Sequence, residues 1–304
     1  MRSRLLCLFV TIISLVAAQP SNGNALERGL RAFSEGRFSE AEPSLREAVA
    51  VQPDSFEARF ALGATFGELK RPTEAIVQLQ VAHRLRPEHP DALKLLAAQY
   101  IAAREYPKAI ALLSGVRAPD EEIYLLLIES SQAGGDSAKS FATAEAAVAR
   151  FPASAQVNCW MGFQLQFSGR YDEARGYLEK AIQLDAGYPA GYYLLGQVLL
   201  KQQKARESIP WFEKAIALEP EDIEARMAYA QAVASAGDLA KALHILQTAE
   251  KSAPRDPRVH LLLSRLWFRL GDEANAREEA SLSLQYRNGE PALPDIPRAL
   301  RRGQ

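Results

Sequence analysis

The stretch from Gly169 to Ile182, GRYDEARGYLEKAI, decides the fold. A turn glycine opens it, and Ala174, Leu178 and Ala181 then follow at helical spacing, which places them on one face of a helix. Small residues at fixed helical positions indicate that a second helix approaches closely, because a larger side chain would clash there. We therefore expect Ala174 and Ala181 to tolerate no large residue, and the segment predicts a helix packed tightly against a neighbour.

The same pattern returns along the chain with a period of 34 residues. Units that start near 22, 56, 90, 121, 155, 189, 223 and 257 give eight copies, and the third is three residues short. We expect this short copy to be a weak joint, near residues 104–121. Two columns of the alignment are almost entirely Ala or Ser, the only exception being a valine: Ala41, Ala75, Ala109, Ser140, Ala174, Ser208, Ala242 and Ala276 in one, and Ala48, Ala82, Val116, Ala147, Ala181, Ala215, Ala249 and Ser283 in the other.

Each copy contains two segments of helical periodicity with a break between them. The break is marked by a glycine in five copies, at Gly36, Gly135, Gly169, Gly237 and Gly271. The run Ser39-Glu40-Ala41-Glu42 predicts a capping box at the start of a second helix. Pro43 and Pro210 share one column slightly deeper in that helix, where each removes a backbone hydrogen bond. The fold class predicted from these patterns is all-α.

This arrangement resembles the tetratricopeptide repeat family. The residues that carry the resemblance are Leu62-Gly63 with Phe66, Leu195-Gly196 with Tyr192, the stretch that begins at Gly169, and the run Phe212–Pro220. The resemblance implies a right-handed α-solenoid of about eight tandem helix-turn-helix repeats, which would occupy residues 19–288. The chain departs from the family in the fourth column, where only Tyr124 and Tyr192 supply the aromatic residue.

The two ends of the chain differ from the repeats. Residues 1–18 carry Arg2 and Arg4, then an apolar run from Leu5 to Val16, then small residues, which is the layout of a cleavable secretory signal peptide. We expect cleavage before Gln19, no membrane-spanning segment after it, and a secreted or periplasmic location, most simply the bacterial cell envelope. Residues 289–304 contain prolines and arginines and predict a flexible tail.

Composition and motifs exclude several classes of function. With 36 basic and 37 acidic residues the net charge is −1, so we expect no nucleic-acid partner. Two cysteines, Cys7 and Cys159, and four histidines favour neither a disulfide framework nor a metal site, and we interpret the histidines as surface or half-buried residues. The chain has no hydrolase, zinc-protease, Walker or dinucleotide motif. We therefore expect a non-enzymatic protein without a cofactor.

The candidate function follows from the resemblance, which implies that the first helices line a concave groove where a protein or peptide partner binds. The candidate residues in that groove are Trp160, Phe163, Gln166, Phe167, Tyr193, Gln197, Arg265 and Arg269. Large aromatic side chains beside amides suit an interface, but the same aromatics can simply pack between helices. The leading hypothesis is an interaction scaffold. The alternatives are a docking subunit of an envelope enzyme or assembly machine, and a stand-alone peptide- or carbohydrate-binding protein; the oligomeric state is left open.

Overall fold

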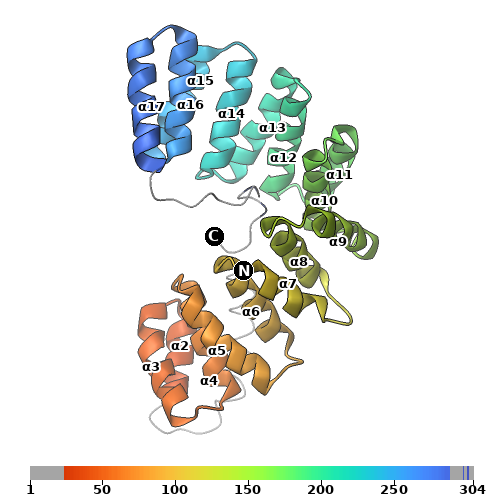
Figure 1. Ribbon diagram of the computed structural model, residues 1–304, viewed down its shortest axis with the longest axis vertical. Helices are drawn as coiled ribbons and strands as arrows, with labels where there is room; N and C mark the ends of the chain where they lie inside the picture. The colour runs from red at the N-terminus through yellow and green to blue at the C-terminus, as the bar shows by residue number, and fades with distance from the viewer. Residues whose placement is uncertain (1–23, 288–296, 298–299, 301–304) are drawn as a thin grey trace. The chain divides into compact units, whose positions relative to one another are not determined.

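The computed structural model describes residues 24–287, 297 and 300, and these contain sixteen α-helices and no strand (Figure 1). The expected signal peptide and nearly all of the expected tail lie outside the described residues. No helix among the described residues combines the length and the apolar character needed to cross a membrane. The helices are α2 (Ala25–Ser34), α3 (Phe38–Val51), α4 (Phe56–Glu68), α5 (Pro72–Leu85), α6 (Pro90–Ala102), α7 (Tyr106–Ser114), α8 (Glu121–Ala133), α9 (Ser137–Arg150), α10 (Ala155–Phe167), α11 (Tyr171–Leu184), α12 (Pro189–Lys201), α13 (Ala205–Leu218), α14 (Ile223–Ser235), α15 (Leu239–Ser252), α16 (Pro257–Leu270) and α17 (Glu273–Arg287).

The chain divides into two compact units. Unit 1 contains α2 to α8 and unit 2 contains α10 to α17, and the division falls inside α9, between Ser140 and Phe141. The joint expected near residues 104–121 therefore lies inside unit 1. Its helix α7 has nine residues and buries only Ala109 and Leu113.

Repeat boundaries read from the sequence coincide with helix starts. Seven of the eight expected unit starts are the first residues of α4, α6, α8, α10, α12, α14 and α16, while α2 begins at Ala25. Within each unit the two helices of a repeat pack together, and the first helix of one repeat also packs on the first helix of the next. Inside each unit the consecutive helices of a repeat thus pair as helix-turn-helix, as the period of 34 predicts.

Close helix contact explains the small-residue columns. Ala75 and Ala174 are fully buried, and a glycine of the first helix faces the same contact. A Cβ added at Gly63 would lie 2.6 Å from Leu79 Cγ, and one added at Gly162 would lie 2.6 Å from Leu178 Cγ. Such distances leave no room for a methyl group, so the two helices approach each other closely in these repeats.

The turn between the two helices requires a left-handed residue. The five glycines expected there have φ between 74° and 104°, while Lys70, Arg104 and Gln203 occupy the same place in the other repeats with φ of 59°, 61° and 64°. The capping box expected at Ser39 was wrong. Because the turn ends immediately after Gly36, α3 already starts at Phe38, with Arg37 as an N-cap that offers no side-chain hydrogen bond.

In five repeats the fourth-column side chain donates a hydrogen bond to the preceding turn, and only one of the five, Tyr192, is the aromatic residue expected there. Each such side chain reaches back six residues and hydrogen-bonds the carbonyl oxygen that precedes its helix. The pairs are Arg59 Nε to Pro53 (2.8 Å), Asn158 Nδ2 to Pro152 (3.1 Å), Tyr192 hydroxyl to Ala186 (3.1 Å), an Arg226 guanidinium nitrogen to Pro220, and His260 Nε2 to Pro254 (3.0 Å). What these five repeats share in the fourth column is therefore a hydrogen bond to the turn that precedes the helix, and not an aromatic ring.

Candidate partner-binding surface

The three aromatic candidates of α10 contact one another in a row that extends from the core to the surface. The ring centroids of Trp160 and Phe163 lie 5.8 Å apart in an edge-to-face arrangement, and those of Phe163 and Phe167 lie 6.5 Å apart. Trp160 is 2% exposed and Phe163 5%, whereas Phe167 is 53% exposed. Of these three residues, only Phe167 therefore has an aromatic ring that a partner could reach.

The candidates of α12 connect to α10 through hydrogen bonds. Gln166 Nε2 donates to Gln197 Oε1 at 3.2 Å, and Gln197 Nε2 donates in turn to the Tyr193 hydroxyl. Tyr193 itself is buried, with its ring edge-on to Phe212. Both amides are half-buried, so this chain of hydrogen bonds fixes the surface beside Phe167 and leaves polar atoms only partly accessible.

Helix α16 presents a second group of exposed candidates. Leu261, Arg265 and Phe268 follow at helical spacing and are all exposed, Phe268 at 69%. No ion pair joins Arg265 to another described residue. Arg269 donates from its guanidinium to the Ala234 carbonyl oxygen at 3.0 Å, which anchors it to α14. This face of α16 combines apolar area with positive charge.

Arg258 and Cys159 are both engaged within the fold. Arg258 pairs with Asp256 at 2.7 Å and with Glu224 at 3.1 Å, and these carboxylates, above all Asp256, raise the pKa of its guanidinium. Cys159 is a free cysteine but is fully buried, and burial raises the pKa of its thiol. A thiol without thiolate character is a poor nucleophile, so Cys159 belongs to the core.

The candidates thus separate into four groups. Trp160, Phe163 and Tyr193 lie in the core, Gln166 and Gln197 hydrogen-bond to each other, and Phe167 lies at the surface. Arg265 and Arg269 lie on α16 beside Leu261, which the sequence analysis missed. The only sequence signal for Leu261 was its position four residues before Arg265 and seven before Phe268, which places the three on one helix face. Whether a partner binds these residues stays a prediction.

Comparison with known proteins finds tetratricopeptide repeats in both units. One profile of these repeats matches residues 68–129 and 199–266, and another matches 26–83 and 165–223. Together they cover residues 26–129 and 165–266, which is more than half of the chain.

Individual relatives are more distant. A TPR repeat-containing thioredoxin of Arabidopsis thaliana, TTL4, is 32% identical over 90 residues, which are 30% of this chain and 13% of that protein. Among solved structures, a chain of the APC/C hetero-tetramer Cut9–Hcn1 is similar with a TM-score of 0.65 at 15% identity, over 92% of this chain and 57% of that one. A tetratricopeptide repeat protein of Parabacteroides merdae ATCC 43184 gives 0.62 at 14% identity, over 77% of this chain and 94% of the other. At these identities the structures show a shared fold alone.

Proposed function

This chain belongs to the tetratricopeptide repeat family, and from that premise we propose that it is a scaffold which binds a protein partner on the first helices of unit 2. The surface consists of Phe167 on α10 and of Leu261, Arg265, Phe268 and Arg269 on α16. The partner is a peptide segment that combines apolar and acidic side chains.

The observation that carries this proposal is the exposure of Phe167 and Phe268. Most aromatic residues of unit 2 are buried or half-buried, while these two expose 53% and 69% of their surface on first helices. Exposed aromatic rings are the commonest anchors of protein interfaces, because they bury a large area at small entropic cost. Arg265 and Arg269 beside Phe268 favour an acidic segment, since a guanidinium pairs well with carboxylates.

The test compares four variants for capture of partners from an envelope extract and for thermal stability. Phe167→Ala and Phe268→Ala should each weaken binding by about 30-fold, equivalent to about 2 kcal/mol, without lowering the melting temperature. Leu284→Ala is the matched control, because Leu284 is 62% exposed but lies on a second helix, α17. Its binding should equal that of the wild type.

Trp160→Ala separates anchoring from packing. Because Trp160 is buried, its truncation should lower the free energy of unfolding by about 3–5 kcal/mol. If Phe167→Ala and Phe268→Ala retain wild-type affinity for the captured partner, the proposed surface is wrong. The burial of Trp160 also argues against a carbohydrate stacked on its ring, so we place the carbohydrate-binding alternative behind the protein-binding one.

We further propose that the protein acts in the cell envelope, either as a free scaffold or as the docking subunit of an enzyme or assembly machine. The support is the charged, apolar and small-residue order of residues 1–18. Mass spectrometry of the protein from fractionated cells should find Gln19 as the N-terminus in the envelope fraction. A cytoplasmic protein that still begins at Met1 would refute this location.

A further inference from the structure

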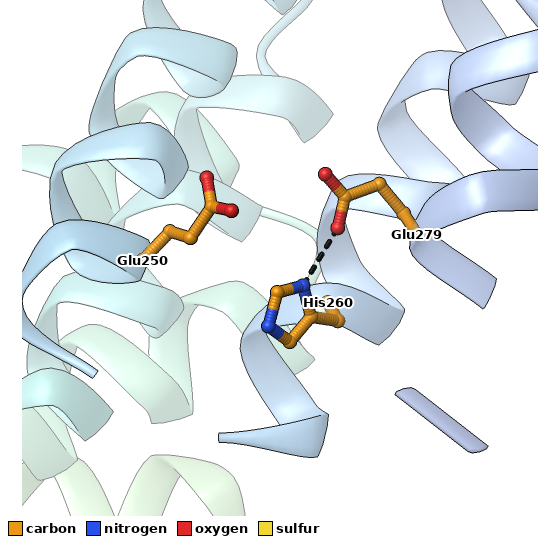
Figure 2. A group of neighbouring side chains, drawn as sticks. All are labelled: Glu250, His260 and Glu279. Atoms are coloured by element: carbon orange, nitrogen blue, oxygen red, sulfur yellow. Dashed lines mark hydrogen bonds and ion pairs between the residues drawn. The ribbon is translucent and has the colours of Figure 1, made fainter. Parts of the chain in front are cut away.

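Three side chains that can bind metal ions meet at the C-terminal end of unit 2 (Figure 2). Glu250 comes from α15, His260 from α16 and Glu279 from α17, and one ligand atom of each lies within 4.8 Å of the others. His260 is 2% exposed, so the interpretation of the histidines as surface or half-buried residues was wrong for this one, and the two carboxylates are partly buried. In Figure 2 Glu250 and Glu279 lie on opposite sides of His260, and a dashed line joins the imidazole to Glu279.

The surroundings of His260 determine which ring nitrogen is available. Nε2 lies 3.0 Å from the carbonyl oxygen of Pro254. A carbonyl oxygen can only accept, so Nε2 carries a hydrogen and donates it. This hydrogen bond is the one that other repeats make from the same column, and it holds the ring in place. Nδ1 is left to face the Glu279 carboxylate, whose Oε2 lies 2.7 Å away.

Without a metal ion, the negative charges of Glu250 and Glu279 outnumber the positive charge that His260 can carry. Nδ1 must then be protonated to donate to Glu279, and one imidazolium faces two carboxylates. Glu250 is the carboxylate left over, because it forms no hydrogen bond or ion pair with another described side chain. A partly buried carboxylate that accepts no hydrogen bond from a side chain is costly.

A divalent cation removes the imbalance. We propose that Glu250, His260 and Glu279 form a binding site for a divalent transition-metal ion, with Zn²⁺ as the representative. The ligands are His260 Nδ1 and one oxygen from each carboxylate, so the charges of ion and ligands cancel. Imidazole nitrogen with carboxylate oxygen is a donor set that zinc accepts, and water occupies the remaining position.

The hydrogen bond from Nε2, although other repeats make it too, suits this assignment. A histidine that binds a metal usually donates its second ring nitrogen to a carboxylate or a backbone carbonyl, which fixes the tautomer and orients the ring. Pro254 supplies that carbonyl here. Two ligand atoms at about 2.0–2.1 Å from a tetrahedral zinc ion lie about 3.3 Å apart. The glutamates reach this spacing by side-chain rotation, which opens the contact between Nδ1 and Glu279 and brings Glu250 inward.

The site would link three consecutive helices. Because each of α15, α16 and α17 supplies one ligand, the ion would tie the last repeat to the second helix of the repeat before it. Metal binding must displace the proton on Nδ1. Zinc affinity should therefore increase with pH.

The experiment is a calorimetric titration of the full chain with Zn²⁺ at pH 8, after removal of metals with a chelator. The wild type should bind one ion per chain. Glu250→Gln is the main variant, because Glu250 forms no hydrogen bond or ion pair with another described side chain, so its replacement should not lower the metal-free melting temperature. We expect it and Glu279→Gln to bind about 100-fold more weakly, since loss of even a supporting hydrogen bond costs about 10–100-fold.

Matched controls distinguish this site from adventitious binding. Glu278→Gln makes the same change at the exposed neighbour of Glu279, and His244→Gln removes an exposed histidine of α15. Both should bind zinc as the wild type does. The inference is overturned if the wild type binds no zinc, if Glu250→Gln binds it with unchanged affinity, or if the control variants lose as much affinity as Glu250→Gln. As a second readout, Co²⁺ should give a visible absorption band in the wild type that Glu250→Gln lacks.

Discussion

At the scale of single residues, the repeats share a backbone conformation even where they do not share a side chain. The residue that turns the chain from first to second helix is left-handed in all eight repeats, but only five have glycine there. The sequence reveals those five, because glycine is a turn signal. Lys70, Arg104 and Gln203 carry no such signal, and only the period of 34 places them in the same column. An L-residue in this conformation costs about 1–2 kcal/mol relative to the right-handed region.

This strain predicts that Gln203→Gly stabilises unit 2. The side chain of Gln203 is exposed, so its removal loses no packing, and the gain should be about 0.5–1 kcal/mol after the added flexibility of the unfolded chain is subtracted. Gly169→Ala should have the opposite effect, costing about 1 kcal/mol, although no atom lies within 4 Å of the added Cβ. Urea unfolding followed by tryptophan fluorescence measures both. If Gly169→Ala leaves the free energy of unfolding unchanged, the turn adapts to a residue with a side chain. The stabilisation expected for Gln203→Gly then loses its reason.

A second prediction at this scale concerns the charge of Asp120. Its carboxylate accepts from the Ile123 N–H at 3.0 Å, which caps α8, and it lies 2.5 Å from Lys94 Nζ. Burial raises the pKa of Asp120, but Lys94 and the backbone N–H groups lower it by more, so the folded-state pKa is below the ordinary value. The stabilisation is therefore present above the unfolded-state pKa, about 3.9, and is lost as the pH falls through the folded-state value.

Asp120→Asn isolates this contribution, because asparagine retains the cap and loses the charge. Near pH 7 the wild type should be more stable by less than about 1 kcal/mol, since half of the Asp120 side chain is exposed. The difference should shrink as the pH falls from about 5 to below 4. Urea unfolding of both proteins by far-UV circular dichroism tests this, and a difference that stays constant with pH would contradict it.

At the scale of helices, the sequence predicted where helices start better than it predicted which side chains are buried. Helix starts follow from the period and from glycine and proline signals, and seven of eight coincide with the structure. The exposure of the candidate residues was harder to predict from the sequence, because Trp160 and Phe167 lie seven residues apart on the same helix. Their exposures of 2% and 53% depend on which neighbouring helix covers them, and spacing within α10 carries no such information.

Close helix contact predicts opposite effects for the same substitution at two glycines of one repeat. Gly162 lies where α10 meets α11, and an added Cβ would be 2.6 Å from Leu178, whose side chain is fully buried. Gly162→Ala should therefore destabilise by about 1–3 kcal/mol. Gly176, within α11, has no atom within 4 Å of its added Cβ, so Gly176→Ala should stabilise by up to about 1 kcal/mol through helix propensity. Shifts of the same sign in urea midpoint would show that the register assigned to these helices is wrong.

At the scale of the whole molecule, the division into two units bears on how the chain unfolds. In a repeat array each helix pair is stabilised chiefly by its neighbours, so regions of different stability can open separately. All three tryptophans, Trp160, Trp211 and Trp267, belong to unit 2. Fluorescence therefore reports on unit 2 alone, while far-UV circular dichroism reports on the helices of both units.

These two probes should give different unfolding curves. Two-state unfolding requires coincident transitions, and we expect the dichroism curve in urea to contain a phase that fluorescence lacks. Substitutions at equivalent glycines assign the phases: Gly63→Ala clashes with Leu79 in unit 1, and Gly162→Ala clashes with Leu178 in unit 2. The first should shift the phase seen only by dichroism, and the second should shift the fluorescence transition. If the wild-type curves coincide and each variant moves both probes equally, coupling extends along the entire array, and the boundary near Ser140 has no energetic counterpart.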